Sequence, residues 1–271
     1  MLHVHPVMSL DQPGLEPYRT MKRPWEHQQQ GIFVAEGEKV VGRLLASRFG
    51  VISLLLPEKW LREYRPLLDQ RPEEIHAYVA EKEQLEKLTG FSMYQGVMAV
   101  GKIPPPQPLA LILQKTPRPC LLAAIDGISN AQNLGVLIRN CAAFGVQAFL
   151  VGETASSPFL RRSVRSSMGA IFHLPIVELT HLEQTLRDLR RMGIRSIAAH
   201  PHGDQFRLSR ANLKGDSCLV FGSEGYGLPP PIVTACDEAV AIPMQGGVDS
   251  LNVGSAAAAF LYEANRQRGK A

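Results

Sequence analysis

Short apolar runs and amphipathic runs alternate along most of this chain. In its second half, apolar runs such as CLLAAID (120–126) and CLVFG (218–222) show no polar alternation, and segments with helical spacing of apolar residues separate them. This pattern is typical of a parallel sheet that helices cover on both faces. It predicts strands at 120–126, 146–151, 173–177, 194–199, 218–222 and 238–243, and helices at 133–143, 158–168, 181–192, 229–235 and 250–266.

The first hundred residues show the same alternation on a smaller scale. We expect strands at 31–35, 51–56, 74–80 and 95–103, with helices near 37–48, 57–68 and 81–88. The pattern therefore predicts a small α/β domain over residues 18–103. Residues 1–17 have weak periodicity, and we expect them to form a loose N-terminal arm.

A proline-rich segment marks the boundary between the two parts. Residues 104–119 contain six prolines, and such runs form extended, semi-rigid spacers. The stretch LALIL within this segment is apolar, so part of the linker should pack on a domain. The second domain is expected over residues 120–271.

The charge and the cysteines narrow the possible classes of protein. Residues 1–101 carry a net charge of −1 and residues 102–271 a net charge of +5, which permits a polyanionic partner. Four cysteines without a CxxC pair indicate reduced, buried thiols, and no metal site is expected. No apolar run reaches the ~18–20 residues of a membrane helix, and the N-terminus lacks the features of a secretory signal. We expect a cytoplasmic protein without a membrane partner.

Three segments rich in glycine and uncharged polar residues follow predicted strands. They are residues 133–139, 221–228 and 242–252. Ligands of parallel α/β sheets bind at the carboxyl ends of the strands, where these segments should lie. The third segment opens an alanine-rich helix, whose first backbone amides are unpaired and carry partial positive charge.

Each segment also has a purely structural interpretation. Arg139 could be a half-exposed, ion-paired arginine, and Ser250 and Asn252 could be helix caps. The glycine run after Phe221 could be an ordinary strand-to-helix turn. It is not a phosphate-binding P-loop, because it lacks the GK[ST] ending, and it is not the dinucleotide fingerprint that follows a first strand. A nucleotide-dependent oxidoreductase is therefore disfavoured.

Taken together, the three segments are more specific than any one of them. With NLGVLIR (133–139), FGSEGYGLP (221–229) and IPMQGGVDSLNV (242–253) in this order, the chain resembles the SpoU (TrmH) family of RNA ribose 2′-O-methyltransferases. The resemblance covers about residues 120–268. It extends to the first domain, where GIFVAEGEKVV (31–41) is similar to the start of an RNA-binding domain often fused in front, and QGV (95–97) to its end.

The resemblance implies a fold, a cofactor and an assembly. The parallel sheet of the second domain would be threaded into a deep trefoil knot, against the usual rule that excludes knots. The methyl donor would be S-adenosylmethionine, and the site would lie at the interface of a homodimer. In front of the first motif, the family usually has Asp-Pro-Gly where this chain has Asn130-Ala131-Gln132, a departure that bears on target choice more than on methyl transfer.

The resemblance also assigns site residues. Cofactor contacts fall on Gly222, Ile242, Met244 and Leu251. The polar positions around the reacting centre are Asn133, Arg139, Glu224, Ser250 and Asn252. His200 follows a predicted strand and is a weaker candidate for the cofactor.

The chemistry suits these residue types. Transfer of a methyl group from a sulfonium to a ribose hydroxyl cancels the charge on sulfur, which a dry, apolar pocket favours. Arginine side chains keep their proton in proteins and are poor bases. We therefore expect Arg139 to bind the target phosphate and to stabilise developing alkoxide charge. The hydroxyl proton would leave to a phosphate oxygen, to Glu224 or to water.

Two groups of cations are candidates for RNA contact. They are Arg19, Lys22, Arg23 and Arg43 in the first domain, and Arg161, Arg162 and Arg165 in the second. The alternative for each group is a solvated helix face. The favoured substrate is ribosomal RNA, with transfer RNA as the alternative. A non-catalytic RNA-binding or ribosome-assembly factor on the same scaffold is a further alternative, which binding of S-adenosylmethionine would disfavour.

Overall fold

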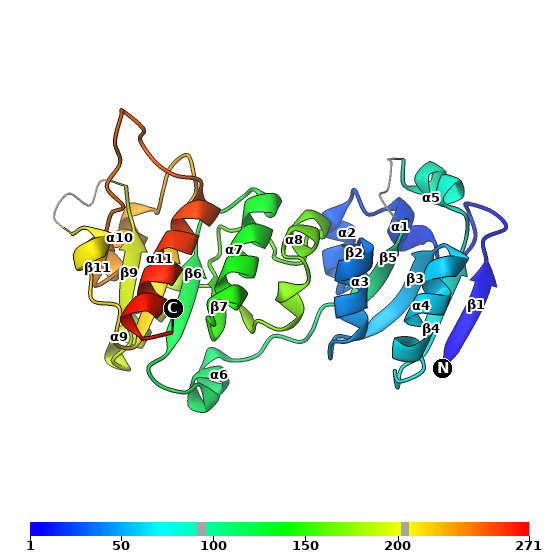
Figure 1. Cartoon of the computed structure of the whole chain (residues 1–271), viewed down its shortest axis with the longest axis horizontal. Helices are drawn as coiled ribbons and strands as arrows, with labels where there is room; N and C mark the ends of the chain where they lie inside the picture. Colours follow the sequence, from blue (N-terminus) through cyan, green and yellow to red (C-terminus); the bar gives the residue numbers. More distant parts are fainter. Residues whose placement is uncertain (91–95, 202–205, 271) are drawn as a thin grey trace. The chain divides into compact units, whose positions relative to one another are not determined.

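The computed structural model describes residues 1–90, 96–201 and 206–270, and these form two compact units (Figure 1). Unit 1 consists of Met1–Pro105 and Phe159–Phe172, and unit 2 of Pro106–Pro158 and His173–Ala271. Within the described residues, no helix is both long enough and apolar enough to cross a membrane. Gln95, at the expected start of a strand, lies outside the described residues.

Unit 1 contains a mixed five-stranded sheet in the order β1-β4-β3-β5-β2. Strands β1, β4 and β3 are parallel, whereas β5 is antiparallel to both of its neighbours. The strands are β1 (Leu2–Pro6), β2 (Ile32–Glu36), β3 (Val51–Leu56), β4 (Ile75–Val79) and β5 (Met98–Lys102). The helices are α1 (Glu16–Arg19), α2 (Pro24–Gln29), α3 (Glu38–Leu45), α4 (Glu58–Leu68) and α5 (Lys82–Thr89). The small α/β domain is as the sequence predicts.

The expectation of a loose arm over residues 1–17 is wrong. Leu2–Pro6 forms β1, which pairs in parallel with β4, and the Val7 amide continues the ladder by donating to the Val79 carbonyl at 2.9 Å. Further along, Leu15 is fully buried. An edge strand is held by backbone hydrogen bonds, which leave little trace in the hydrophobic pattern.

The boundary predicted for the second domain also needs correction, because Phe159–Phe172 belongs to unit 1. The ring centroids of Phe159 and Phe172 lie 5.7 and 5.8 Å from that of Phe33 in β2. Between these two phenylalanines runs α8 (Arg161–Ser166), whose Arg161 and Arg165 form ion pairs with Glu36. Glu36 is only 6% exposed, and a buried carboxylate requires cationic or hydrogen-bonding partners.

The proline-rich segment is partly helical. Helix α6 (Leu109–Lys115) begins directly after Pro108, a position at which proline does not disturb a helix. Its Leu109, Ile112 and Leu113 pack against the apolar core of unit 2, as expected for LALIL. These partly buried side chains hold the linker helix against unit 2.

Unit 2 contains a six-stranded sheet in the order β11-β9-β10-β6-β7-β8, and every neighbouring pair is parallel. The strands are β6 (Leu121–Ile125), β7 (Ala148–Val151), β8 (Ile176–Glu178), β9 (Arg195–Ala199), β10 (Ser217–Phe221) and β11 (Glu238–Val240). The principal helices are α7 (Ala131–Ala143), α9 (Leu182–Arg191), α10 (Pro230–Ala235) and α11 (Val253–Gln267). The predicted parallel sheet is confirmed, while the trefoil knot stays a prediction.

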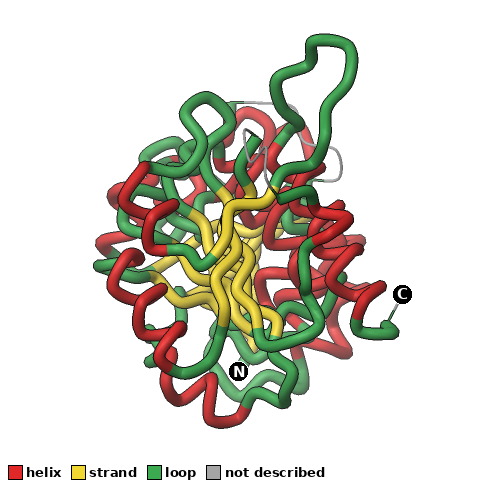
Figure 2. Tube along the Cα trace, turned by 90° about the vertical axis from the view of Figure 1, so that its left-hand side faces the viewer, coloured by secondary structure: helices red, strands yellow, loops and turns green. Residues whose placement is uncertain are grey.

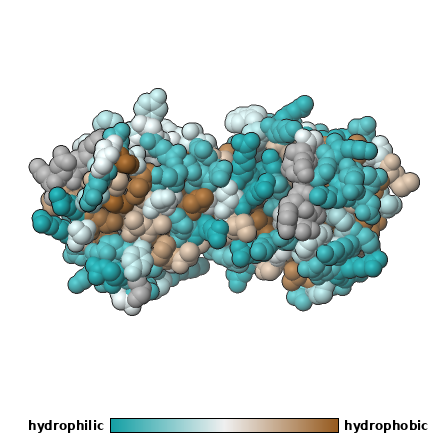
Figure 3. Space-filling model, turned by 45° about the horizontal axis from the view of Figure 1, so that its top comes forward, coloured by the Kyte–Doolittle hydropathy of each residue, from teal (hydrophilic) through white to brown (hydrophobic). Residues whose placement is uncertain are grey.

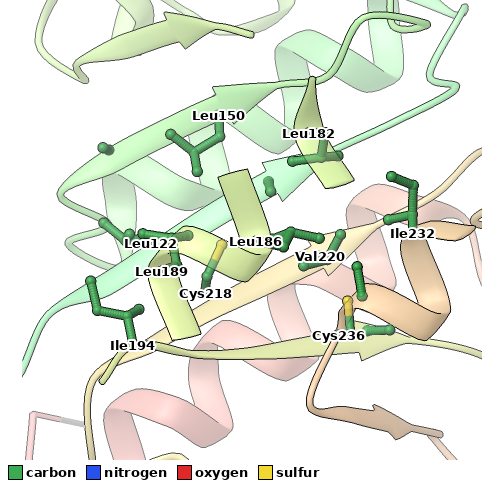
Figure 4. Packing of buried hydrophobic residues seen from close by; sticks show 14 of the residues in the cluster. Leu122, Leu150, Leu182, Leu186, Leu189, Ile194, Cys218, Val220, Ile232 and Cys236 are labelled. Carbon is green, nitrogen blue, oxygen red and sulfur yellow. The ribbon is translucent and has the colours of Figure 1, made fainter. Parts of the chain in front are cut away.

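Helices cover both faces of this sheet (Figure 2). On one face, Leu182, Leu186 and Leu189 of α9 lie at helical spacing and pack on the strands (Figure 4). Alternate residues of the strands, such as Leu122 and Val220, point into this same core. Full burial of a leucine contributes about 1.5–3 kcal/mol, so this layer fixes the strands whose ends form the site.

Helices α7 and α11 pack closely against each other on the other face. A Cβ at Gly254 would lie 2.7 Å from Cγ1 of Val136, so only glycine permits this approach. The Asn140 side-chain amide donates to the Gly254 carbonyl at 2.8 Å. The small residues at the start of α11 thus serve contact within the fold.

All four cysteines are free and buried, in agreement with the sequence analysis. Burial disfavours the charged thiolate and raises the pKa of Cys120 to about 11 and that of Cys236 to about 12. These thiols are packing residues rather than nucleophiles.

Candidate active site

A cavity of about 390 Å³ lies at the carboxyl ends of β9, β10 and β11. Its walls include Ala199, Phe221 and Val240, which stand at the ends of these three strands. The lining is completed by loop residues and by the first turns of α11. A ligand site at this edge of the sheet is what the sequence predicts.

The four residues expected to contact the cofactor all line the cavity: Gly222, Ile242, Met244 and Leu251. Gly222 lies so close to the returning chain that a Cβ there would be 2.2 Å from the carbonyl carbon of Gly227 and 2.3 Å from the amide nitrogen of Leu228. The Ser223 amide donates to the Gly227 carbonyl at 3.0 Å, and the Gly227 amide donates back at 2.9 Å. These contacts fix the loop against one wall of the cavity.

Three of the predicted polar residues meet beside the cavity. The Asn252 side-chain amide donates to a carboxylate oxygen of Glu224 and, at 3.3 Å, to the side-chain oxygen of Asn133. Glu224 and Ser250 also line the cavity. Residues separated by more than 100 positions in the sequence therefore form one hydrogen-bonded cluster.

The helix caps explain how this cluster is held. The Asn252 side-chain oxygen accepts from the Gly254 amide at 2.9 Å and caps α11, so the same side chain caps a helix and orients Glu224. At the start of α7, the Asn130 side chain accepts from the amides of Gln132 and Asn133 at 2.9 and 3.3 Å. Asn130 lies in the triplet that departs from the family pattern, and here it serves as an N-cap.

Arg139 lies apart from this cluster. It is exposed on α7, does not line the cavity, and has no side-chain partner within the described part of the chain. It follows Asn133 by six residues, which is about 9 Å along the helix and about 120° around it. In the single chain, Arg139 is therefore outside the cavity.

The loops around the cavity expose apolar side chains. Tyr226 is 99% exposed, and Val248 and Leu251 are also exposed. In the space-filling view, the side of unit 2 that faces the viewer carries an apolar area bordered by hydrophilic residues (Figure 3). Apolar surface of this kind is expected where a ligand or a partner binds.

Comparisons with known proteins agree with this geometry. A sequence model of the SpoU rRNA methylase family matches residues 121–262. An uncharacterised tRNA/rRNA methyltransferase of Mycobacterium tuberculosis is 32% identical over 273 residues, covering 98% of this chain and 93% of the relative. The chain belongs to the SpoU methyltransferase family.

Two further similar proteins are informative. The 23S rRNA (guanosine-2′-O-)-methyltransferase RlmB of Ralstonia nicotianae is 35% identical over 193 residues, covering 70% of this chain and 76% of the relative. The SpoU methyltransferase AviRb of Streptomyces viridochromogenes, solved in complex with AdoMet, superposes with a TM-score of 0.80 and 25% identity, covering 95% of this chain and 98% of that one. The family resemblance drawn from the sequence is confirmed, and the chain is an RNA methyltransferase of the SpoU family.

The cations expected to contact RNA have different surroundings in this SpoU protein. Arg43 donates to the Met168 carbonyl, and Arg161 and Arg165 pair with Glu36. Lys22 and Arg162 are exposed. Arg19 and Arg23 are exposed as well, and they pair with Asp11 at 2.8 Å and with Glu26 at 3.2 Å.

Several cavity residues received no role in the sequence analysis, among them Tyr226 and Asp249. His200, which the sequence analysis named only as a weaker candidate, also lines the cavity. Tyr226 and Asp249 lie inside the two loops singled out by the motifs, and this position was the available signal. His200 directly follows β9, a strand end without any glycine motif.

Replacement of Asn252 separates its two functions in the SpoU site. Asn252→Asp keeps the oxygen that accepts from the Gly254 amide, but it removes the donor to Glu224 and adds a like charge beside it. We expect Asn252→Asp to unfold close to the wild-type temperature and to lose most methyl transfer. Asn252→Ala should lose transfer and also about 1 kcal/mol of helix capping. Thermal unfolding and initial rates check both variants, and a fully active Asn252→Asp protein would contradict the role given to this donor.

Proposed function

We propose that this protein transfers a methyl group from S-adenosylmethionine to a ribose 2′-hydroxyl of ribosomal RNA. The observation that carries the proposal is the cluster of Asn133, Glu224 and Asn252 beside a cavity at the strand ends. The names of two relatives support it: one is a 23S rRNA guanosine-2′-O-methyltransferase, and another was solved with AdoMet.

The cavity suits such a donor. Its volume of about 390 Å³ falls within the ~300–1,000 Å³ of small-molecule sites. At Gly222 the backbone itself forms the wall, because no Cβ fits there. Gly222, Ile242, Met244 and Leu251 would hold the donor, which when bound supplies a methyl group on a positively charged sulfur. The proposed methyl transfer needs no metal ion.

We assign the chemical step to residues of this chain as follows. Val240, Ile242 and Phe260 give the cavity apolar walls, which favour a step that cancels charge. Glu224, which accepts a hydrogen bond from Asn252, would accept a hydrogen bond or the proton from the ribose hydroxyl. A phosphate oxygen of the RNA or water is the alternative acceptor. Ser250, also in the wall, would orient the ribose.

Arg139 requires a second copy of the chain. It is exposed and outside the cavity of its own chain, whereas its proposed role demands contact with the target phosphate. We propose a homodimer in which Arg139 of each copy reaches the cavity of the other. A guanidinium fork suits this role, since it binds phosphate through two parallel hydrogen bonds.

Unit 1 would bind the RNA substrate. We propose that the exposed cations Arg19, at the end of α1, and Lys22 and Arg23, in the turn before α2, contact phosphates, with Arg162 as a further contact. Arg43, Arg161 and Arg165 would take part only by exchanging their present partners. Phosphate contacts make affinity fall steeply with salt. Buried, reduced thiols suit a protein that acts in the cytoplasm.

The experiment is a methylation assay with labelled S-adenosylmethionine and total cellular RNA from cells that lack the protein. A 2′-O-methyl group removes the hydroxyl that attacks the adjacent phosphate in alkali, so labelled sites survive alkaline hydrolysis as dinucleotides. We expect the label in ribosomal RNA and in this alkali-resistant fraction. Label in mononucleotides would indicate base methylation, and label in transfer RNA alone would reassign the substrate. Donor binding without any label would favour a non-catalytic factor.

A further inference from the structure

A largely exposed tryptophan lies on the surface of unit 1. Trp25, in the first turn of α2, is 68% exposed, although the neighbouring large side chains Tyr18, Met21 and His27 are buried. We infer that Trp25 is a platform on which an unpaired base of the RNA substrate stacks. This inference rests on the proposed RNA methyltransferase function and adds a site outside the catalytic cavity.

The first argument is the direction of the Trp25 side chain. Tyr18 of α1, Met21 in the turn between the helices and His27 of α2 are buried in the core, whereas Trp25 is on the exposed side of α2. An indole exposes a large apolar area to water, and its burial by a ligand is strongly favourable. The flat ring is therefore available to a flat partner.

The second argument is the positive charge next to Trp25 in the sequence. Lys22, Arg23 and Pro24 precede Trp25 in sequence, and the two cations are exposed. Arg23 pairs with Glu26 at 3.2 Å, but both side chains are exposed, and such pairs contribute little. An incoming phosphate can therefore displace Glu26 at small cost. Lys22 extends towards the end of α5, with its Nζ 3.5 Å from the position of a Cβ at Gly90.

An aromatic ring beside exposed cations fits single-stranded RNA better than a protein surface. Bases of unpaired nucleotides stack on aromatic side chains while basic residues contact the backbone. A protein partner of matching charge would be acidic, and it would not need a flat ring. The ligand assigned to this surface is an unpaired nucleotide with its flanking phosphates.

The second tryptophan of the chain is an internal reference. Trp60 in α4 is half-buried, with its ring centroid 5.7 Å from that of Tyr64 and with Nζ of Lys59 5.3 Å from its ring centroid. Phenylalanine at either position leaves one tryptophan whose fluorescence reports on a single site.

The test is a fluorescence titration of the full chain with single-stranded 12-nucleotide oligo(A) and oligo(U). Stacking on a base quenches indole fluorescence. We expect quenching in Trp60→Phe, where only Trp25 emits, and little change in Trp25→Phe. In a competition binding assay, Trp25→Ala should bind the oligonucleotides about 5- to 150-fold more weakly than the wild type. Lys22→Ala should keep the quenching and reduce the salt dependence of binding by about one phosphate contact.

Three results would overturn the inference. They are unchanged emission of Trp60→Phe on saturation with RNA, equal quenching in both single-tryptophan variants, and emission of Trp60→Phe that changes with protein concentration without RNA. The last result would assign the ring to an interface between copies. If Trp25 does not stack on a base, labelling of RNA by S-adenosylmethionine is still expected. If the protein is not a methyltransferase, labelling is lost although the quenching can remain. The two failures are therefore distinguishable.

Discussion

Arg139→Ala should lower the rate of methyl transfer by about 10²–10³-fold and leave the affinity for S-adenosylmethionine within a factor of two. The reason is positional. Arg139 lies on the exposed side of α7 and does not line the cavity, so its removal takes nothing from the donor site. Its loss removes only the cation proposed to neutralise charge on the RNA. Single-turnover rates and calorimetric titration with the donor measure the two quantities separately.

Arg139→Lys is the matched control for this prediction. Lysine keeps the positive charge but loses the planar fork, so we expect an activity between those of the wild type and the alanine variant. Equal losses of donor affinity and transfer rate in Arg139→Ala would contradict the role in charge neutralisation. That pattern would place Arg139 in the donor site itself.

Gly222→Ala should weaken binding of S-adenosylmethionine by about tenfold or more and reduce methyl transfer accordingly. The added Cβ would lie 2.2 Å from the carbonyl carbon of Gly227 and 2.3 Å from the Leu228 amide nitrogen. Both atoms belong to the backbone and cannot rotate away as the end of a side chain can. The loop that carries Glu224 must move, and the wall of the cavity moves with it. Calorimetric titration measures the loss.

Gly225→Ala is the matched control in the same loop. Nothing lies within 4 Å of a Cβ at Gly225, and its backbone does not have the positive φ that favours glycine. We expect this variant to bind the donor as the wild type does. If Gly222→Ala also binds normally, the loop does not form the donor wall.

Mixing the two impaired variants tests the dimer, provided that the donor concentration is kept well below the Kd of Gly222→Ala. If Arg139 acts on the partner's cavity, a mixed dimer of Arg139→Ala and Gly222→Ala chains has one complete site. After subunit exchange at equal concentrations, activity should return to about a quarter of the wild-type value, since half of the dimers are mixed and one of their two sites is complete. No recovery, with exchange demonstrated, would mean that Arg139 acts within its own chain.

The sequence predicted those parts of the fold that depend on local hydrophobic patterns. The strands at 51–56 and 120–126 and the amphipathic helix near 181–192 all appear with ends shifted by at most two residues. Long-range pairing was not predictable in this way. Strand β1 is an edge strand held by backbone bonds, and Phe159–Phe172 joins unit 1 through phenylalanines and a buried carboxylate far away in sequence.

The sequence predicted those parts of the site that lie at the carboxyl ends of predicted strands. Gly222, Ile242, Met244 and Leu251 line one cavity because parallel strands bring their carboxyl ends together. The link from Asn252 to both Glu224 and Asn133 depends on side-chain directions that spacing does not give. By contrast, the helical spacing does indicate that Arg139 lies on another side of α7 from Asn133, since six residues turn the side chain by about 120°.

The central claim is that the cavity at the ends of β9, β10 and β11 holds the methyl donor beside Glu224. A crystal structure of the protein soaked with S-adenosylmethionine tests it most directly. We expect the donor against Gly222, Ile242 and Leu251, with its methyl group directed towards the side of the cavity where Glu224 and Asn252 meet. A donor bound elsewhere, or a methyl group directed away from Glu224, would contradict this account.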